Sequence, residues 1–460
     1  MEDYQRIADT VAADIAAGRL RPGDRLATQR AFARAHGIAN STATRVYREL
    51  ARRGLTVGEV GRGTYVRAAQ HAPGPALAEP ADPARRTRVN LELNYPEVPG
   101  QAALLARGLT RLLRPDVLSA TMAVAPATGT GPARDACAAL LARADFRPDP
   151  AGLLFAGNGR QAIAGALAAL VPPGGRLGVE ALTYPLVKSV AARLGVTLVP
   201  LATDAYGLRP DALRAAHRGA PLSAVYVQPT LHNPLGVTMP AERRDELAGT
   251  LRALGLWAVE DAVWSFLLGD ARSAALPPLA ALAPERTLLV DSLSKRLSPG
   301  LTIGLVLAPP AHADRVAAAL RSGGWTAGAF ALNAAAGWLL DGTVTTVVEA
   351  KRRDAAARQE LLSAHLEGFR VQADPASYFA WWELPGPWRA ETFLAAAARH
   401  GIAVTPGAAF AVGQEGAHGA APAPHAVRVA LAGAAADELP YALDTLAAIA
   451  RGTPEDAQPD

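Results

Sequence analysis

The chain has 460 residues, which is more than one ordinary hydrophobic core accommodates and predicts two or three domains. Half of the residues are apolar and 19% are charged, which is typical of a folded protein and excludes a disordered one. The single cysteine, Cys137, excludes a disulfide framework and a thiolate metal cluster. The first residues are acidic where a signal peptide is basic, and no apolar run is long enough to cross a bilayer. We therefore expect a cytoplasmic protein without membrane contact.

Basic charge is concentrated at the N-terminus. Residues 1–68 hold 12 arginines against 7 carboxylates, a net charge of +5, while the whole chain carries +4. Positive charge confined to a small segment is typical of nucleic-acid binding. The chain has only three lysines, Lys188, Lys295 and Lys351, among 46 basic residues. A lysine kept in so arginine-rich a chain is a candidate for amine chemistry, which a guanidinium group does not perform.

The first 68 residues are predicted to form three helices followed by a hairpin. Apolar residues recur at helical spacing between residues 4 and 15. Thr28 is predicted to cap a second, short helix, and Asn40 or Ser41 a third. Residues 56–66 are predicted to form two short strands around a Gly-Arg-Gly tip. This order of elements is that of a winged helix-turn-helix, a mainly α unit with a β wing.

Residues 18–66 resemble the DNA-binding domain of the GntR superfamily of transcription regulators. The resemblance implies that the third helix lies in the major groove of double-stranded DNA. The residues that it places near bases or phosphates are Arg30, Ser41, Thr42, Thr44, Arg45 and, in the minor groove, Arg62. The sequence departs from the family at Asn40 and Thr44, where arginine is common, so the operator sequence does not transfer. The alternative is a small protein–protein interaction module with a solvated arginine face.

Two segments lack an apolar period. Residues 69–89 are rich in alanine and proline and are predicted to be an extended linker between two domains. Residues 451–460 are predicted to be a flexible tail.

Between residues 90 and 450, short apolar runs alternate with helical stretches rich in alanine and leucine. This alternation predicts a mostly parallel sheet covered on both faces, with ligands bound beyond the carboxyl ends of its strands. The runs are residues 153–156, 177–179, 196–199, 224–227, 257–259, 288–290 and 303–307.

Polar residues follow four of these runs. Lys295 comes after residues 288–290, Asp261 after 257–259 and Asn233 after 224–227, and a Gly-Asn-Gly turn that opens a helix comes after 153–156. An amine that can form a Schiff base, a carboxylate for a pyridine nitrogen and a helix N-terminus for a phosphate are the groups that a pyridoxal phosphate site needs.

The segment 90–450 resembles the fold-type I, class I/II aminotransferases, which have a large α/β domain and a small C-terminal subdomain. The whole chain resembles the MocR subfamily of GntR regulators, in which a winged helix precedes such a domain. By this resemblance Lys295 forms the Schiff base with pyridoxal 5'-phosphate, Asp261 pairs with its ring nitrogen and Asn233 binds its ring hydroxyl. Tyr184 stacks on the ring, and Arg428 binds a substrate or effector carboxylate. The residues around the phosphate are Gly159, Arg160, Gln161, Ser292 and Ser294.

The segment departs from the family pattern at two positions. Val263 stands where a tyrosine commonly donates to the ring oxygen, and Thr302 where an arginine commonly binds the phosphate. Both losses favour ligand sensing over rapid transamination. We expect Arg160 to replace the missing phosphate arginine. The alternative is that Arg160 points to solvent.

These observations predict a DNA-binding transcription regulator with a degenerate aminotransferase domain that senses an amine or amino acid. An effector amine would displace Lys295 from the cofactor. Two alternatives stay open: an active aminotransferase that carries a winged helix, and a regulator whose cofactor site is only structural. The family resemblance also implies a homodimer. The histidines show no metal-binding pair, and no serine lies in a nucleophile-elbow motif, so neither a metal site nor a hydrolase is expected.

Overall fold

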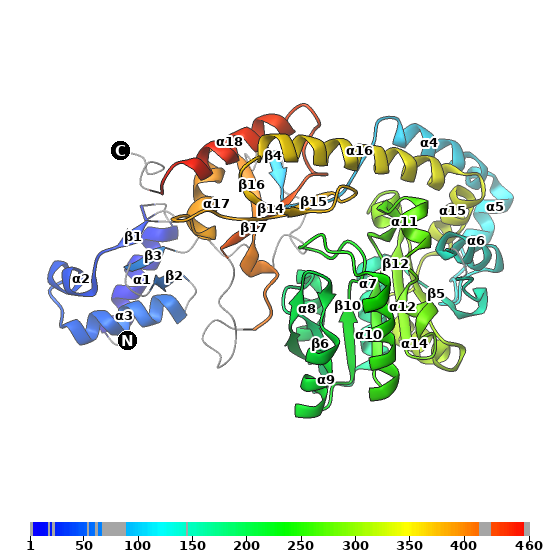
Figure 1. Ribbon diagram of the computed structural model, residues 1–460, viewed down its shortest axis with the longest axis horizontal. Coiled ribbons are helices and arrows are strands. Elements are labelled where there is room, and N and C mark those ends of the chain that lie inside the picture. Colours follow the sequence, from blue (N-terminus) through cyan, green and yellow to red (C-terminus); the bar gives the residue numbers. More distant parts are fainter. Residues whose placement is uncertain are drawn as a thin grey trace.

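The computed structural model describes residues 3–16, 19–20, 24–52, 55–59, 63–66, 89–143, 146–413 and 425–454. The N-terminal part contains the three predicted helices and the wing (Figure 1). The helices are α1 (Asp3–Ala16), α2 (Gln29–Ala35) and α3 (Asn40–Arg52). The strands β1 (Arg25–Leu26), β2 (Thr56–Glu59) and β3 (Gly63–Val66) form one antiparallel sheet in the order β1-β3-β2. The predicted winged helix-turn-helix is confirmed.

Local hydrogen bonds and a small hydrophobic core stabilise this N-terminal unit. Thr28 caps α2 as predicted, because its hydroxyl accepts from the backbone N–H of Ala31 at 3.3 Å. The predicted cap of α3 is wrong by one residue: the helix already begins at Asn40, and the carbonyl of Ala39 accepts its first backbone bond. Tyr47 packs edge-on against Phe32 in the buried core. The core thus fixes α3 against α2.

A seven-stranded sheet forms the centre of the large domain, and each of its strands coincides with one predicted apolar run. Its order is β5-β13-β12-β11-β10-β6-β7, and every pairing is parallel except those of β13. The strands are β5 (Leu153–Ala156), β6 (Arg176–Glu180), β7 (Thr197–Leu201), β10 (Ala224–Val227), β11 (Trp257–Asp261), β12 (Thr287–Ser292) and β13 (Gly304–Leu307).

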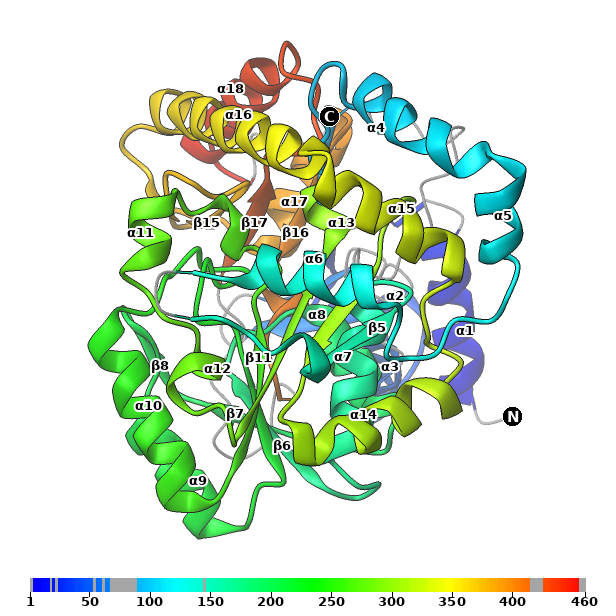
Figure 2. The ribbon, with the colours of Figure 1, turned by 90° about the vertical axis from the view of Figure 1, so that its right-hand side faces the viewer.

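Helices cover both faces of this sheet, as predicted. Leu153, Phe155 and Leu305 face a core shared with α4, α6, α15 and α16, whereas the alternate residues Leu154 and Val306 face a core shared with α7 and α14. Figure 2 shows α4 and α5 along the outer side of α15. The helices of this part are α4 (Gln101–Leu109), α5 (Pro115–Thr121), α6 (Gly131–Leu141), α7 (Gly159–Leu170), α8 (Pro185–Arg193), α9 (Pro210–Gly219), α10 (Ala241–Leu254), α11 (Asp270–Ala274), α12 (Leu279–Leu282), α13 (Leu293–Arg296), α14 (Pro310–Ser322), α15 (Ala329–Leu340) and α16 (Thr343–His365).

Short elements connect these helices and strands. The 3₁₀ turns are η1 (Thr110–Leu113), η2 (Pro150–Gly152), η3 (Ser265–Leu267) and, in the C-terminal part, η4 (Gly407–Ala409). A two-stranded ribbon consists of β8 (Thr203–Asp204) and β9 (Gly207–Leu208).

A five-stranded sheet forms the small domain, in the order β14-β15-β17-β16-β4. Its strands are β14 (Arg370–Ala373), β15 (Phe379–Glu383), β16 (Ile402–Pro406), β17 (Ala426–Ala430) and β4 (Val89–Leu91), and its helices are α17 (Ala390–Arg399) and α18 (Leu439–Arg451). The edge strand β4 comes from the start of the aminotransferase-like segment and pairs in parallel with β16. The last residue of the predicted linker, Val89, and the first of the predicted tail, Arg451, therefore belong to a strand and a helix.

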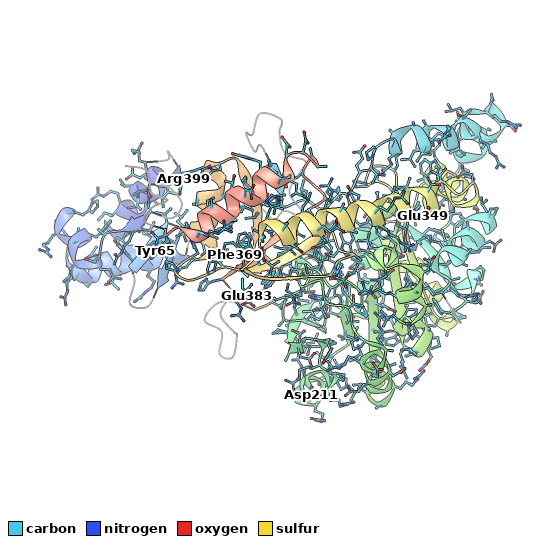
Figure 3. All side chains as sticks on the ribbon, turned by 45° about the horizontal axis from the view of Figure 1, so that its top comes forward. Tyr65, Asp211, Glu349, Phe369, Glu383 and Arg399 are labelled. Carbon is cyan, nitrogen blue, oxygen red and sulfur yellow. The ribbon has the colours of Figure 1, made fainter. Side chains whose placement is uncertain are left out.

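The long helix α16 connects the two domains. It packs against α15 and α13 of the large domain and against α18 of the small one. Figure 3 shows it running from the region of Glu349, over the large domain, toward Phe369 at the small sheet. The Lys295 turn, α13, therefore contacts a helix that continues into the small domain.

Candidate functional site

A cavity of about 440 Å³ lies at the carboxyl ends of β10, β11 and β12, as expected for an open α/β sheet. All predicted cofactor and effector residues except Gln161 line it. They come from the ends of β11 and β12, the loop after β10, the starts of α7 and α8, the turn α13 and the middle of β17, which are far apart in the sequence. They are Gly159, Arg160, Tyr184, Asn233, Asp261, Ser292, Ser294, Lys295 and Arg428.

Lys295 lies in the single turn α13 that follows β12. Its Nζ donates to the backbone carbonyl of Asn94 at 2.6 Å and lies 3.9 Å from the centre of the Tyr95 ring. Burial lowers the pKa of Lys295 well below its usual value, and nearby cationic side chains lower it further. The neutral, nucleophilic amine is therefore populated at a lower pH than in a free lysine.

Asp261 ends β11, and both of its carboxylate oxygens have donors. Oδ2 accepts from the Tyr226 hydroxyl at 2.5 Å and from Nε2 of Gln228 at 2.9 Å, and Oδ1 accepts from the backbone N–H of Val263 at 3.0 Å. Burial raises the pKa of Asp261, whereas these hydrogen bonds lower it. The network fixes the carboxylate in one orientation inside the cavity.

Asn233 and Arg428 meet on the side of the cavity toward the small domain. The backbone N–H of Asn233 donates to Oε1 of Gln228 at 3.2 Å. Arg428, on β17, donates to Oδ1 of Asn233 at 3.4 Å, to Oγ1 of Thr405 at 3.3 Å and to the backbone carbonyl of Glu92. Its Nε has no hydrogen-bond partner among the described residues. Burial lowers the pKa of Arg428 to about 10, so it stays a cation at neutral pH.

The start of α7 forms another wall. Oδ1 of Asn158 accepts from the backbone N–H of Gln161 at 3.0 Å and so caps the helix. A Cβ atom at Gly159 would lie 2.9 Å from Oγ of Ser292, so this close approach needs glycine. Arg160 donates to the Tyr95 hydroxyl at 2.6 Å and lines the cavity, so the alternative that it points to solvent is wrong.

Serine hydroxyls complete this wall. Oγ of Ser292 accepts from the backbone N–H of Ser294 at 3.2 Å. The hydroxyls of Ser294 and Thr302 lie 3.0 Å apart. Thr302 is therefore engaged with Ser294 at the place where the family carries an arginine. Gln161 does not line the cavity, and its backbone N–H is already bound by the helix cap, so its predicted role in phosphate binding stays a prediction.

Tyr184 precedes α8 and lines the cavity. Burial raises the pKa of its hydroxyl to about 12, whereas the neighbouring Arg160 lowers it. The hydroxyl is therefore protonated at neutral pH. Its predicted stacking on a cofactor ring stays a prediction.

Several residues in or directly behind the cavity wall were not predicted from the sequence. Tyr226 and Gln228 orient Asp261, and Asn94, Tyr95 and Trp264 surround Lys295. The sequence contained one signal for two of them. Tyr226 lies within the fully buried parallel strand β10 and Gln228 follows it directly, at positions where apolar residues are the rule. Asn94 and Tyr95 gave no such signal, because they belong to a segment that reaches the site from the small domain's edge strand.

The residues present fit pyridoxal phosphate. A weakly basic lysine, a fixed carboxylate, a capped helix N-terminus and two serine hydroxyls form the donor set that its aldehyde, ring nitrogen and phosphate need. Arg428 lines the same cavity, and its buried Nε is a donor without a hydrogen-bond partner among the described residues. The site accordingly holds every type of group that this cofactor requires.

The predicted DNA-contact residues lie on α2 and α3, apart from Arg62, which lies outside the described residues. Arg30, Ser41 and Arg45 are exposed, and Arg45 stacks over the Tyr4 ring at 4.4 Å. Thr42 and Thr44 are half-buried, and the Thr44 hydroxyl donates to Oε1 of Gln29 at 2.8 Å. Thr44 therefore joins α2 to α3, whereas the side chains of Arg30, Ser41 and Arg45 are exposed.

No described helix is long and apolar enough to span a membrane. No group of three or more histidine, cysteine or acidic residues within the described ranges is placed to hold a metal ion.

The fold and the cavity define a winged helix-turn-helix joined to a fold-type I, pyridoxal phosphate-dependent aminotransferase domain. Comparison with known proteins agrees: the chain belongs to the aminotransferase class I and II family, whose profile matches residues 93–446. Residues 3–66 match the family of bacterial regulatory proteins called gntR. This combination is that of the MocR subfamily, so the predicted family and fold class are confirmed.

Individual relatives cover most of the chain. The HTH-type transcriptional regulator YdeF of Bacillus subtilis is 28% identical, over 89% of this chain and 87% of its own length. PdxR of Corynebacterium glutamicum, named as a pyridoxine biosynthesis transcriptional regulator, is 29% identical over 74% of this chain and 73% of its own. The crystal structure of an archaeal alanine:glyoxylate aminotransferase superimposes with a TM-score of 0.69 at 23% identity, covering 79% of this chain and 90% of its own, and shows the shared fold.

Proposed function

We propose that this protein is a transcription regulator that binds double-stranded DNA through its N-terminal domain. It binds pyridoxal 5'-phosphate covalently through Lys295 and senses an amine or amino acid. The observation that carries the proposal is the buried Lys295 amine in one cavity with the fixed carboxylate of Asp261. When bound, the cofactor supplies an electron-withdrawing ring whose aldehyde reacts with amines. A relative named for the regulation of pyridoxine biosynthesis supports a link to this cofactor.

Different residues of the cavity bind different parts of the cofactor. Lys295 provides the attachment point, and Asp261 keeps a proton on the pyridine nitrogen, because Tyr226 and Gln228 hold its carboxylate in place. Asn233 binds the ring hydroxyl. The N-terminus of α7 would hold the phosphate, because the helix dipole favours an anion there. The residues that surround the phosphate are Gly159, Arg160, Ser292 and Ser294.

Sensing is favoured over turnover by two positions. Val263 lines the cavity and has no hydroxyl to donate to the ring oxygen. Thr302 has a hydroxyl, which pairs with the Ser294 hydroxyl, where the family commonly has the positive charge of an arginine. Both changes leave the cofactor's attachment point, Lys295, in place and remove groups that assist transamination in the family. The active aminotransferase is the second candidate, because the lysine, carboxylate and Arg428 of such an enzyme are all in the cavity.

The test is spectroscopic. The purified protein with pyridoxal phosphate should show a visible absorbance band that changes when an amine is added, and Lys295→Ala should abolish the band. Asn333→Ala is a matched control outside the cavity. Absence of the band from the wild-type protein would refute cofactor sensing and leave a purely structural site. Product formed at enzymatic rates from an amino donor and a keto acid would establish the second candidate.

A further inference from the structure

The four residues that lead from the end of β12 into α13 contribute three side chains to the cavity. Ser292, Ser294 and Lys295 all line it, and Oγ of Ser292 accepts from the backbone N–H of Ser294 at 3.2 Å. The proposed phosphate-binding serines and the proposed attachment point therefore lie within one short turn. The shape of this turn sets the distance and direction from the serines to the Lys295 amine.

A buried ion pair joins the two ends of this turn. Its members are Asp291 and Arg296, the residues directly before and after the segment 292–295. Nη2 of Arg296 donates to Oδ2 of Asp291, while Oδ1 of Asp291 accepts from the backbone N–H of Ser292 at 2.7 Å. Both side chains are buried, and neither lines the cavity. The pair therefore closes the segment that carries the three cavity side chains without being part of the cavity wall.

The ion pair lies among apolar side chains. Val290 lines the cavity, so Leu289 and Asp291, its neighbours along β12, point to the opposite face of the sheet. The Arg296 guanidinium lies 5.1 Å from the centre of the Phe266 ring, which belongs to the core on that face. Burying two charges is costly, and replacing such a pair by apolar residues of similar volume is often neutral or stabilising. Folding stability alone therefore gives no reason for a charged pair at this place.

Two further buried side chains fix the backbone of the same turn. Nζ of Lys351, on α16, donates to the backbone carbonyls of Lys295 and Leu297 at 3.0 and 2.6 Å. Nε2 of Gln101, at the start of α4, donates to the carbonyl of Leu297 at 3.0 Å. Neither of these side chains lines the cavity. Polar groups outside the cavity thus hold both the ends of the turn and its backbone.

We propose that Asp291 and Arg296 are positioning residues, which hold the Lys295 amine in a fixed place relative to the phosphate-binding serines. The inference rests on the proposed function and extends it to residues outside the cavity. In the attachment step, Nζ of Lys295 bonds to the aldehyde carbon of the cofactor, and the aldehyde oxygen leaves as water with both hydrogens of the neutral amine. An amine held in place reacts as if it were highly concentrated, and a misplacement of about 1 Å costs up to about a hundredfold.

Two ligands separate attachment from binding. Pyridoxal 5'-phosphate can bond to Lys295, whereas 4'-deoxypyridoxine 5'-phosphate has a methyl group in place of the aldehyde and binds without attachment. Calorimetry with the cofactor-free full-length protein gives both dissociation constants. Their ratio reports how well the Lys295 amine is placed, because a general loss of stability would weaken the binding of both ligands alike.

Asp291→Val together with Arg296→Met replaces the pair by apolar side chains and should melt near the wild-type temperature. The wild-type protein should bind pyridoxal phosphate at least about a hundredfold more tightly than the deoxy analogue, and the double variant should reduce this ratio about tenfold or more. Arg296→Lys, which keeps the charge but not the planar guanidinium, should give an intermediate ratio. Asp204→Val with Arg243→Met removes an ion pair outside the cavity and should leave the ratio unchanged.

A wild-type ratio in the double variant would overturn the inference, and so would an equal fall of the ratio in the control. If the double variant does not fold, Arg296→Lys decides in the same way: a lowered ratio supports the inference and an unchanged ratio overturns it. A ratio near one in the wild-type protein would instead refute the proposed function, and the inference with it.

Discussion

Arg160 reaches from the first turn of α7 into the cavity, on the wall where Thr302 replaces the family's phosphate arginine. Arg160→Ala should weaken binding of pyridoxal phosphate, because a charge-assisted hydrogen bond contributes about 1.5–3 kcal/mol, or about ten- to a hundredfold in affinity. Adding Thr302→Arg should restore most of the loss if both positions serve one phosphate. Equilibrium titration with the cofactor measures this. Wild-type affinity in Arg160→Ala would show that Arg160 does not bind the phosphate.

Lys351 supports the Lys295 turn from α16. It is fully buried, and its Nζ donates to the backbone carbonyls of Lys295 at 3.0 Å and Leu297 at 2.6 Å. Burial lowers the pKa of Lys351 from 10.5 to about 7. Between pH 7 and pH 10.5 the unfolded chain therefore binds more protons than the folded one, and the contribution of this group to stability rises with pH.

Lys351→Met should remove this pH dependence. The melting temperature of the wild-type protein should exceed that of the variant by more at pH 9 than at pH 7. Arg353→Met, an exposed change on the same helix, should give the same small difference at both pH values. A wild-type advantage over Lys351→Met that does not grow with pH would contradict the low pKa.

At the scale of single elements, α3 carries the exposed Arg45 and α2 carries the exposed Arg30. Arg30→Ala and Arg45→Ala should each weaken DNA binding and reduce the slope of log affinity against log salt by about one, because each arginine neutralises about one phosphate. Fluorescence anisotropy with a labelled duplex taken from the promoter region of the protein's own gene measures both effects. Cofactor absorbance should not change. Unaltered affinity in the double variant would rule out docking through α2 and α3.

The strands of the large sheet show which features of the fold can be predicted from the sequence. All seven strands of the large sheet were predicted, because parallel strands buried on both faces are continuous apolar runs. Lys295, Asp261 and Asn233 were placed in one site because each follows such a strand. The antiparallel direction of β13 and the pairing of β4 with β16 were not predicted, since partner and direction depend on contacts far along the chain. For the same reason the donors of Asp261 became visible only in the structure.

At the scale of the whole molecule, an exposed apolar surface supports the predicted homodimer. Leu113, Met122 and Val124, around α5, are 66%, 83% and 95% exposed. Exposed apolar residues grouped in this way are typical of protein–protein interfaces. Val124→Glu together with Met122→Glu should convert a dimer into a 47.6 kDa monomer in light scattering. Tyr206→Glu, at an exposed position next to the β8–β9 ribbon, is the control and should stay dimeric. Dimers of undiminished stability in the double variant would place the interface elsewhere.

The central claim is that one lysine of the three binds the cofactor covalently. Lys295 lines the cavity. Lys188 and Lys351 do not line it, and both donate to backbone carbonyls elsewhere. Borohydride reduction of the protein loaded with pyridoxal phosphate, followed by peptide mapping, tests this most directly. The label should be found on Lys295 alone. A label on Lys188 or Lys351, or no label on a protein saturated with cofactor, would contradict the account.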